Sequence, residues 1–309
     1  MPTIFSLDDI VREALPDGDL PRVAIARSAN EFVLDSALQA FEAGLADPIL
    51  IGDKAKTLAI AQRMGKDLSA LRIIDLPDDV KAVREAVRLY REGEAQFIMK
   101  GLVSTAILLR AVLDKETGVP PEGILSHVSA FNAPHNGGRL MLLTDPGVNI
   151  RPNMQRKVDI VRNALHVARA LGIEKPRVAM LAATEKVNYP AMPATLDADV
   201  ISKMAAKGEF GDARIAGPMA LDIALSPDAA SCKNFGGEVA GCADILVTSD
   251  IESGNILYKS LNTLLGADMA GVVVGSRVPV VVPSRGDSAK SKFYSLALAS
   301  YLSRKGGAA

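Results

Sequence analysis

The stretch VPVVVPSRGDSAKSKF, residues 278–293, is the most informative part of the chain. Near its start it has three consecutive valines at 280–282, a run typical of a strand that is buried on both faces. It then changes to the hydroxyl and charged side chains of Ser284, Arg285 and Asp287, and a helical pattern follows. In open parallel sheets, ligands bind at the carboxyl ends of strands, where helix N-termini present free N–H groups. The stretch therefore predicts a buried strand that ends at a ligand site.

The rest of the chain repeats this alternation of short apolar runs with longer amphipathic stretches. Helical spacing of apolar residues is found at 31–44, 78–93 and 153–173. The alternation predicts βαβ units and a mainly parallel sheet, hence an α/β fold. Strands are expected at 22–27, 48–52, 72–76, 95–101, 140–145, 177–184, 243–250, 270–276 and 279–283.

A cluster of turn residues, TDPGVNIRPN at 144–153, interrupts the series near its middle. We therefore place a domain boundary near residue 140, between a first α/β domain at 1–139 and a second at 140–283. With 309 residues, of which 49% are hydrophobic, the chain is long enough for two such domains.

Composition excludes several classes of partner. The formal net charge of −1 gives no overall field that would favour nucleic acid or an anionic membrane. No apolar run approaches the ~20 residues of a membrane span, and the N-terminus lacks the apolar core of a signal peptide. Cys232 and Cys242 suit neither a zinc site nor a redox pair, so we expect free thiols and a cytoplasmic location.

A second strand-to-helix junction, FIMKGLVSTAILLRAVL at 97–113, resembles the opening stretch in its chemistry. Each junction combines a glycine, hydroxyls and cations, a mixture that suits a phosphate or a developing oxyanion. The alternative interpretation of each is a helix cap beside a surface arginine. The candidate ligand-binding residues of this junction are Lys100, Gly101, Ser104, Thr105 and Arg110.

A third candidate is SDIESGNILYKSL at 249–261. Asp250 ends an expected strand, Asn255 suits a turn, and Lys259 is placed on the first turn of the helix after it. The alternative is a capped helix with a solvated lysine. No metal is predicted, because the three histidines do not stand at metal-ligand spacing. No Walker A motif or dinucleotide fingerprint supports nucleotide binding either.

Three segments resemble the phosphate acetyl/butyryltransferase family, and more closely its butyryltransferase branch. They are KGLVSTAILLR (100–110), SDIESGNILYK (249–259) and GSRVPVVVPSRGDS (275–288). The resemblance implies a fold akin to the isocitrate/isopropylmalate dehydrogenases, with a cleft between two domains and segment 284–309 completing the first. It also implies a homodimer, which the apolar segment 270–276 supports weakly.

The resemblance implies a reversible reaction of acyl-CoA with phosphate to give acyl phosphate and CoA, through a ternary complex. CoA is then a substrate, and no cofactor is expected. The family's motif residues map onto Ser284, Arg285, Thr105 and Arg110. One departure stands out: the acetyltransferase branch has an aspartate base seven residues after the motif serine, where this chain has Ser291.

Asp287 is the one carboxylate near the motif that could take the role of the missing base. We expect it on the first turn of the following helix, with a helix cap or an ion pair to Lys290 as its alternative roles. Two other functions stay open. One is a non-catalytic acyl-CoA-binding or regulatory protein on the same scaffold, and the other a metal- and NAD(P)-dependent β-decarboxylating dehydrogenase.

Overall fold

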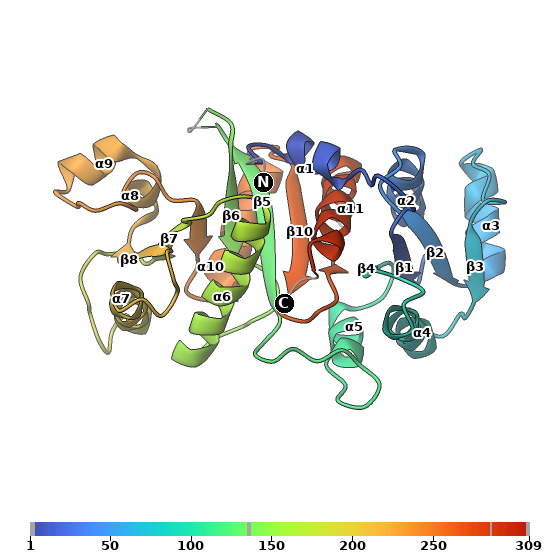
Figure 1. Cartoon of the computed structure of the whole chain (residues 1–309), viewed down its shortest axis with the longest axis horizontal. Coiled ribbons are helices and arrows are strands. Elements are labelled where there is room, and N and C mark those ends of the chain that lie inside the picture. The colour runs from blue at the N-terminus through green and yellow to red at the C-terminus, as the bar shows by residue number, and fades with distance from the viewer. Residues whose placement is uncertain (1–3, 135–136, 285, 307–309) are drawn as a thin grey trace. The chain divides into compact units, whose positions relative to one another are not determined.

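The computed structural model describes residues 4–134, 137–284 and 286–306 (Figure 1). The chain divides into two compact units. Unit 1 comprises the chain up to Leu7 together with Gly123–Ala267, and unit 2 comprises Asp8–Glu122 together with the chain from Asp268 onward. Unit 2 is therefore built from two separate stretches of sequence.

Unit 2 contains a strand series in the order β3-β2-β1-β4-β11-β10. All neighbours in it are parallel except β10 and β11. The short strands are mostly interior, as continuous apolar runs such as RVAIA and MAGVVV require. Their bounds are β1 Arg22–Ala26, β2 Asp47–Gly52, β3 Arg72–Asp75, β4 Phe97–Lys100, β10 Met269–Val274 and β11 Val280–Val281.

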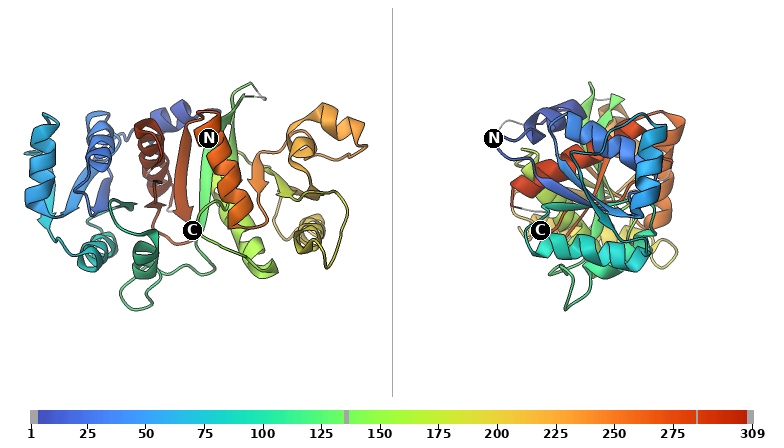
Figure 2. Two further views of the ribbon diagram at one scale, coloured as in Figure 1. Left: turned by 180° about the vertical axis from the view of Figure 1, so that it is seen from behind. Right: turned by 90° about the vertical axis from the view of Figure 1, so that its right-hand side faces the viewer.

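Helices cover both faces of the unit 2 strands. α2, α3 and α11 lie on one face, and α4 and α5 on the other (Figures 1 and 2). Side-chain oxygens cap the first turns of most of these helices, for example Asn30 on α2, Ser104 on α5 and Ser288 on α11. The bounds are α1 Leu7–Ala14, α2 Glu31–Glu42, α3 Lys54–Arg63, α4 Asp79–Arg91, α5 Thr105–Val112 and α11 Ala289–Arg304.

Unit 1 contains the order β5-β6-β9-β7-β8, parallel except for the pair of β5 and β6. α6 and α10 lie on opposite faces of these strands (Figures 1 and 2). Its elements are β5 Ser126–Ala133, β6 Arg139–Thr144, α6 Met154–Ala170, β7 Arg177–Leu181, α7 Pro193–Ala206, β8 Arg214–Met219, α8 Leu221–Leu225, α9 Pro227–Cys232, β9 Ile245–Val247, α10 Ile251–Lys259 and a π-helical turn at Ser260–Leu264.

The mixed α/β architecture with mainly parallel strands confirms the fold class expected from the sequence. The unit boundaries differ from the expected ones at residues 140 and 284. They fall earlier because β5 pairs with β6, which takes 126–133 into unit 1, and because α11 packs on β10, which takes 269–281 into unit 2. β10 is completely buried, so its apolar character is a requirement of the core and gives no support to a dimer contact.

No helix within the described residues is long and apolar enough to cross a bilayer.

Candidate active site

The two junctions singled out in the sequence end neighbouring strands of unit 2. β11 pairs with β4 in parallel, with Val281 opposite Met99. Lys100 is the last residue of β4, and Ser284 follows the end of β11. Because parallel neighbours end at the same edge of a sheet, the two turns lie together at that edge. The candidate active site of unit 2 is therefore formed by the residues after β4 and β11.

The turn after β4 has no room for a side chain at Gly101. A Cβ there would lie 2.2 Å from the backbone oxygen of Arg27, in the turn that follows β1. Backbone bonds hold the two turns together, since Leu102 N donates to Arg27 O over 2.8 Å. A glycine is therefore required at position 101 by the close approach of the two turns.

Lys100, Ser104 and Thr105 surround the beginning of α5. The Lys100 ammonium donates to Val103 O over 3.2 Å and is half-buried. Ser104 is the N-cap, and its hydroxyl accepts from Ile107 N. Thr105 is the first helical residue and is half-buried. Ser104 is therefore a helix cap, which was the alternative interpretation of this junction. The other free N–H groups at the α5 N-terminus still lie at the edge of the sheet.

Arg110 lies further along α5, on its last turn, and is exposed. Its side chain lines a hollow of about 190 Å³ between α4 and α5, together with Arg84 and Asp114. The five residues from Thr105 to Arg110 rise by about 7–8 Å along the helix axis. Arg110 can therefore reach a ligand at the α5 N-terminus only through its long side chain.

The Asp287 carboxylate forms a hydrogen bond within the turn after β11. Ser284 N donates to Asp287 Oδ2 over 2.7 Å, and Asp287 N donates to Ser284 O over 3.2 Å. Both residues are half-buried. These two hydrogen bonds connect Ser284 and Asp287 to each other across the turn. Arg285 lies outside the described residues.

The expected position of Asp287 was wrong, and the structure contradicts both of its alternative roles, the helix cap and the ion pair to Lys290. α11 begins at Ala289 with Ser288 as its N-cap, so Asp287 precedes the helix instead of lying on its first turn. Lys290 pairs with Asp268, at 3.0 Å, and not with Asp287. A serine at the N-cap satisfies the N–H of Ser291, which leaves the Asp287 carboxylate to serve the turn.

The position of the missing aspartate is occupied by a buried structural serine. The Ser291 hydroxyl accepts from Met269 N over 3.1 Å and so attaches α11 to β10. The next residue, Lys292, is only 3% exposed, and its ammonium donates to the backbone oxygen of Asp287. Sequence reasoning missed Lys292. A signal was present, because Lys292 shares a helical stripe with the buried Leu296 and Ala299.

In unit 1, the third motif forms a tightly packed helix start. α10 begins at Ile251, so Asn255 lies inside the helix and Lys259 at its end, which corrects the turn expected at Asn255 and the first-turn position expected for Lys259. Asp250 forms a capping box with Ser253. Burial pushes the pKa of Asp250 upward, but hydrogen bonds from Ser253 and Ser249 outweigh it and hold this pKa below its usual range.

Contacts inside unit 1 also explain why this helix contains a glycine. A Cβ at Gly254 would lie 2.6 Å from Asp145 O, so α10 packs directly on the loop after β6. Asn255 donates to Pro146 O over 3.2 Å. The Lys259 ammonium lies 5.1 Å from the centre of the Tyr258 ring. Asp250 and Asn255 thus have structural partners in addition to any ligand.

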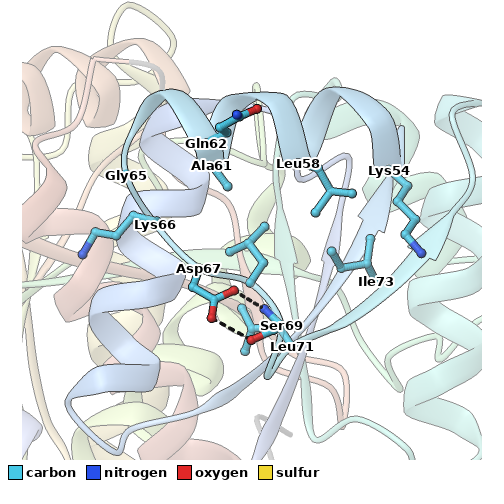
Figure 3. A pocket seen from close by; sticks show the side chains of 11 residues that line it. Lys54, Leu58, Ala61, Gln62, Gly65, Lys66, Asp67, Ser69, Leu71 and Ile73 are labelled. Carbon is cyan, nitrogen blue, oxygen red and sulfur yellow. Dashed lines mark hydrogen bonds between the residues drawn. The ribbon is translucent and has the colours of Figure 1, made fainter.

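Another hollow lies elsewhere in unit 2. It has a volume of about 700 Å³ and lies between α3 and the edge strand β3 (Figure 3). Leu58, Leu71 and Ile73 contribute its apolar wall, with Lys54 at one end and Lys66 at the other. None of the predicted site residues lines it. Among the described residues, no cluster of three or more His, Cys, Asp or Glu side chains could hold a metal ion.

Known proteins resemble this chain both in sequence and in structure. The family model described as phosphate acetyl/butaryl transferase matches residues 78–300. A phosphate butyryltransferase of Clostridium acetobutylicum is 42% identical over 296 residues, which cover 96% of this chain and 97% of that protein. The crystal structure of a branched-chain phosphotransacylase from Enterococcus faecalis is 34% identical, with a TM-score of 0.80, over 91% of this chain and 98% of that one.

A more distant structure shares the fold alone. 4-Hydroxythreonine-4-phosphate dehydrogenase from Klebsiella pneumoniae is 14% identical and superposes with a TM-score of 0.55 over 92% of this chain and 100% of its own. It supports the dehydrogenase-like fold expected from the sequence. The extent of the family match and the identity to the clostridial relative show that this chain belongs to the phosphate acetyl/butaryl transferase family.

Proposed function

We propose that this chain transfers a short acyl group reversibly between CoA and inorganic phosphate, in a ternary complex of acyl-CoA and phosphate. The observation that carries the proposal is the pairing of β4 with β11, because it puts two turns rich in hydroxyls and cations at one edge of unit 2. The names of the two similar proteins, a phosphate butyryltransferase and a branched-chain phosphotransacylase, support it.

In the proposed reaction, a phosphate oxygen attacks the thioester carbonyl carbon. A C–O bond forms, the C–S bond breaks, and CoA leaves as a thiolate that takes up a proton. Lys100, Thr105 and Arg110 would bind phosphate, because a cation and a hydroxyl at a helix N-terminus offset its charge. The Ser284 hydroxyl would donate to the carbonyl oxygen as negative charge develops there.

Arg285 would hold phosphate bidentately and reduce its repulsion from the developing oxyanion. Arg285→Ala is expected to lower turnover by about 10²- to 10³-fold, the range for loss of one preorganised charge stabiliser. The melting temperature should stay close to that of the unmodified protein. Turnover within threefold of the unmodified enzyme would remove Arg285 from the site.

Asp287 is the proposed general base for the CoA thiol when acyl phosphate is the acyl donor, and the general acid in the other direction. Its carboxylate accepts from the Ser284 N–H and so belongs to the same turn as the Ser284 hydroxyl. A thiol of ordinary pKa, about 8.5, gains from a nearby base at neutral pH. In unit 1, Asp250, Asn255 and Lys259 remain candidates for contact with CoA.

The remaining parts of the proposal concern cofactors, assembly and location. CoA acts as a substrate, and no metal or redox cofactor takes part. The chain assembles as a homodimer and works in the cytoplasm. Sedimentation of the purified protein at micromolar concentration tests the dimer, and a monomeric mass would contradict it.

The deciding experiment is a turnover assay of the purified protein with acetyl-, propionyl- and butyryl-CoA, each with and without phosphate. Phosphate-dependent release of CoA, together with trapping of the acyl phosphate by hydroxylamine, is expected. Binding of acyl-CoA without turnover would favour the regulatory alternative. Reduction of NAD(P) in the presence of a divalent metal and a 2-hydroxy acid would favour the dehydrogenase.

A further inference from the structure

Lys292 is a charged side chain in an interior position that the proposed reaction does not use. It lies on the first turn of α11 and is 3% exposed. Its neighbours along the buried face of α11 are apolar or small, including Ser295, Leu296 and Ala299. Burying an ammonium is costly unless polar contacts compensate, whereas a methionine would fill the same space without that cost. The lysine therefore has a role beyond packing.

The contacts of the ammonium indicate what that role is. It donates to the backbone oxygen of Asp287, the residue whose carboxylate closes the turn after β11. It also lies 5.5 Å from the centre of the Phe32 ring, on the first turn of α2. α2 follows β1, and β1 and β11 are the two neighbours of β4. Lys292 thus contacts both the turn after β11 and the first helical turn of α2, the helix that follows β1.

The Asp287 turn is held from two directions. The Asp287 carboxylate accepts from Ser284 N, and the Asp287 carbonyl accepts from the buried Lys292 ammonium. Burial lowers the pKa of Lys292, and the nearby Asp287 carboxylate offsets part of this effect. The site thus has a buried cation beneath the turn that would meet two anionic substrates.

We infer that Lys292 is a positioning residue for acyl transfer: its ammonium fixes the backbone at Asp287 and so holds Asp287, and Ser284 that is bonded to it, in reactive orientation. This inference rests on the proposed function. Lys292 touches no substrate, and its effect is transmitted through the Asp287 carbonyl. Misplacement of a reacting group by about 1 Å can cost about 10²-fold in rate, so a small relaxation of the turn is enough to matter.

The test compares Lys292→Met with Lys290→Met. Methionine is unbranched and only one atom shorter than lysine, and it removes the ammonium. Lys290 lies on the same helical turn, is exposed, and pairs with Asp268 away from the active-site turn. For Lys292→Met we expect kcat to fall by about 10- to 10²-fold with KM values changed less than threefold. Lys290→Met should retain full activity, and Lys292→Arg, which keeps a cationic donor, should recover part of the lost kcat.

A second readout is independent of turnover. Amide hydrogen exchange should be faster at residues 286–288 in Lys292→Met, while the core amides of α11 stay protected. A lower melting temperature with unchanged kcat and unchanged exchange in the turn would make Lys292 a stability residue and overturn the inference. The same conclusion follows if neither variant of Lys292 folds.

The two proposals fail in different ways. If the unmodified protein shows no phosphate-dependent turnover, the proposed function is wrong, and the exchange rates at 286–288 still decide whether Lys292 holds the turn. If the unmodified protein turns over and Lys292→Met is equally active, the function stands and the positioning role is wrong.

Discussion

Replacing Asp287 by asparagine separates its chemical role from its structural one. The Asn side chain is nearly the same shape, and its carbonyl oxygen can still accept from Ser284 N, a bond that is 2.7 Å long in the native turn. Exchanging a charged acceptor for a neutral one weakens this bond by about 1 kcal/mol. Loss of turn geometry alone is thus expected to cost about fivefold in rate.

Loss of a general base is expected to lower the rate of acyl transfer to CoA further, by about 10²-fold or more at neutral pH. If Asp287→Asn depends on thiolate already present in solution, its rate should follow ionisation of CoA. With a thiol pKa of about 8.5, the thiolate fraction rises from about 3% at pH 7 to about 75% at pH 9. The variant should therefore regain about 25-fold relative to its own rate at pH 7.

The assay follows thioester formation from acyl phosphate and CoA, by ultraviolet absorbance, from pH 6.5 to 9.5. Asp268→Asn is the matched control, because it removes a unit 2 carboxylate that pairs with Lys290 outside the turn. It should behave like the unmodified protein. A loss for Asp287→Asn that is the same at every pH, with a lower melting temperature, would refute the base and leave Asp287 as a residue that only closes the turn.

Arg110→Ala should raise the KM for phosphate more than that for acyl-CoA, as measured by initial rates with each substrate varied; a larger rise for acyl-CoA would assign Arg110 to the CoA site. Gly101→Ala should destabilise the protein by about 2–3 kcal/mol, because its methyl group would lie 2.2 Å from Arg27 O. Gly286→Ala is the control and should leave stability unchanged, because its methyl group would meet nothing within 4 Å. Equal melting temperatures of the two variants would contradict the close contact at Gly101. Burial raises the pKa of Tyr294 to about 12, and its hydrogen bond to Asp8 contributes to this shift. The folded state therefore holds the phenol proton more tightly than the unfolded chain does. The free energy of unfolding should fall as the pH rises from about 10 towards 12. Tyr294→Phe should show a flatter pH dependence of the melting temperature over that interval, and an unchanged slope would assign the alkaline loss to other groups.

Local patterns in the sequence were sufficient for most elements of the fold. The runs RVAIA, FIMK and MAGVVV form strands because continuous apolar residues fit a sheet that is covered on both faces. The strands β5 and β8 were not predicted. β5 buries Ser126, His127 and Ser129 in an antiparallel pair, and β8 contains Gly217 and Pro218, so neither has the composition typical of a strand.

The sequence by itself also predicted which residues belong to the candidate site. Lys100, Thr105 and Ser284 follow apolar runs and precede helical patterns, and the resemblance assigned their chemistry. Only the tertiary structure decided that the turns after β4 and β11 are neighbours, because strands far apart in sequence pair according to long-range burial, which no local pattern records.

The partners of individual charged side chains were also decided by the tertiary structure. Ser288 is the N-cap of α11, and Asp268 forms an ion pair with Lys290. The Asp287 carboxylate instead accepts from Ser284 N, and the Asp287 carbonyl accepts from the buried Lys292 ammonium. A sequence window shows that a charge is present at a position, but its partner depends on which donors and acceptors folding brings within about 3 Å of it. For this reason the sequence determined which polar side chains are available near the candidate site, and the tertiary structure decided which contacts each of them makes.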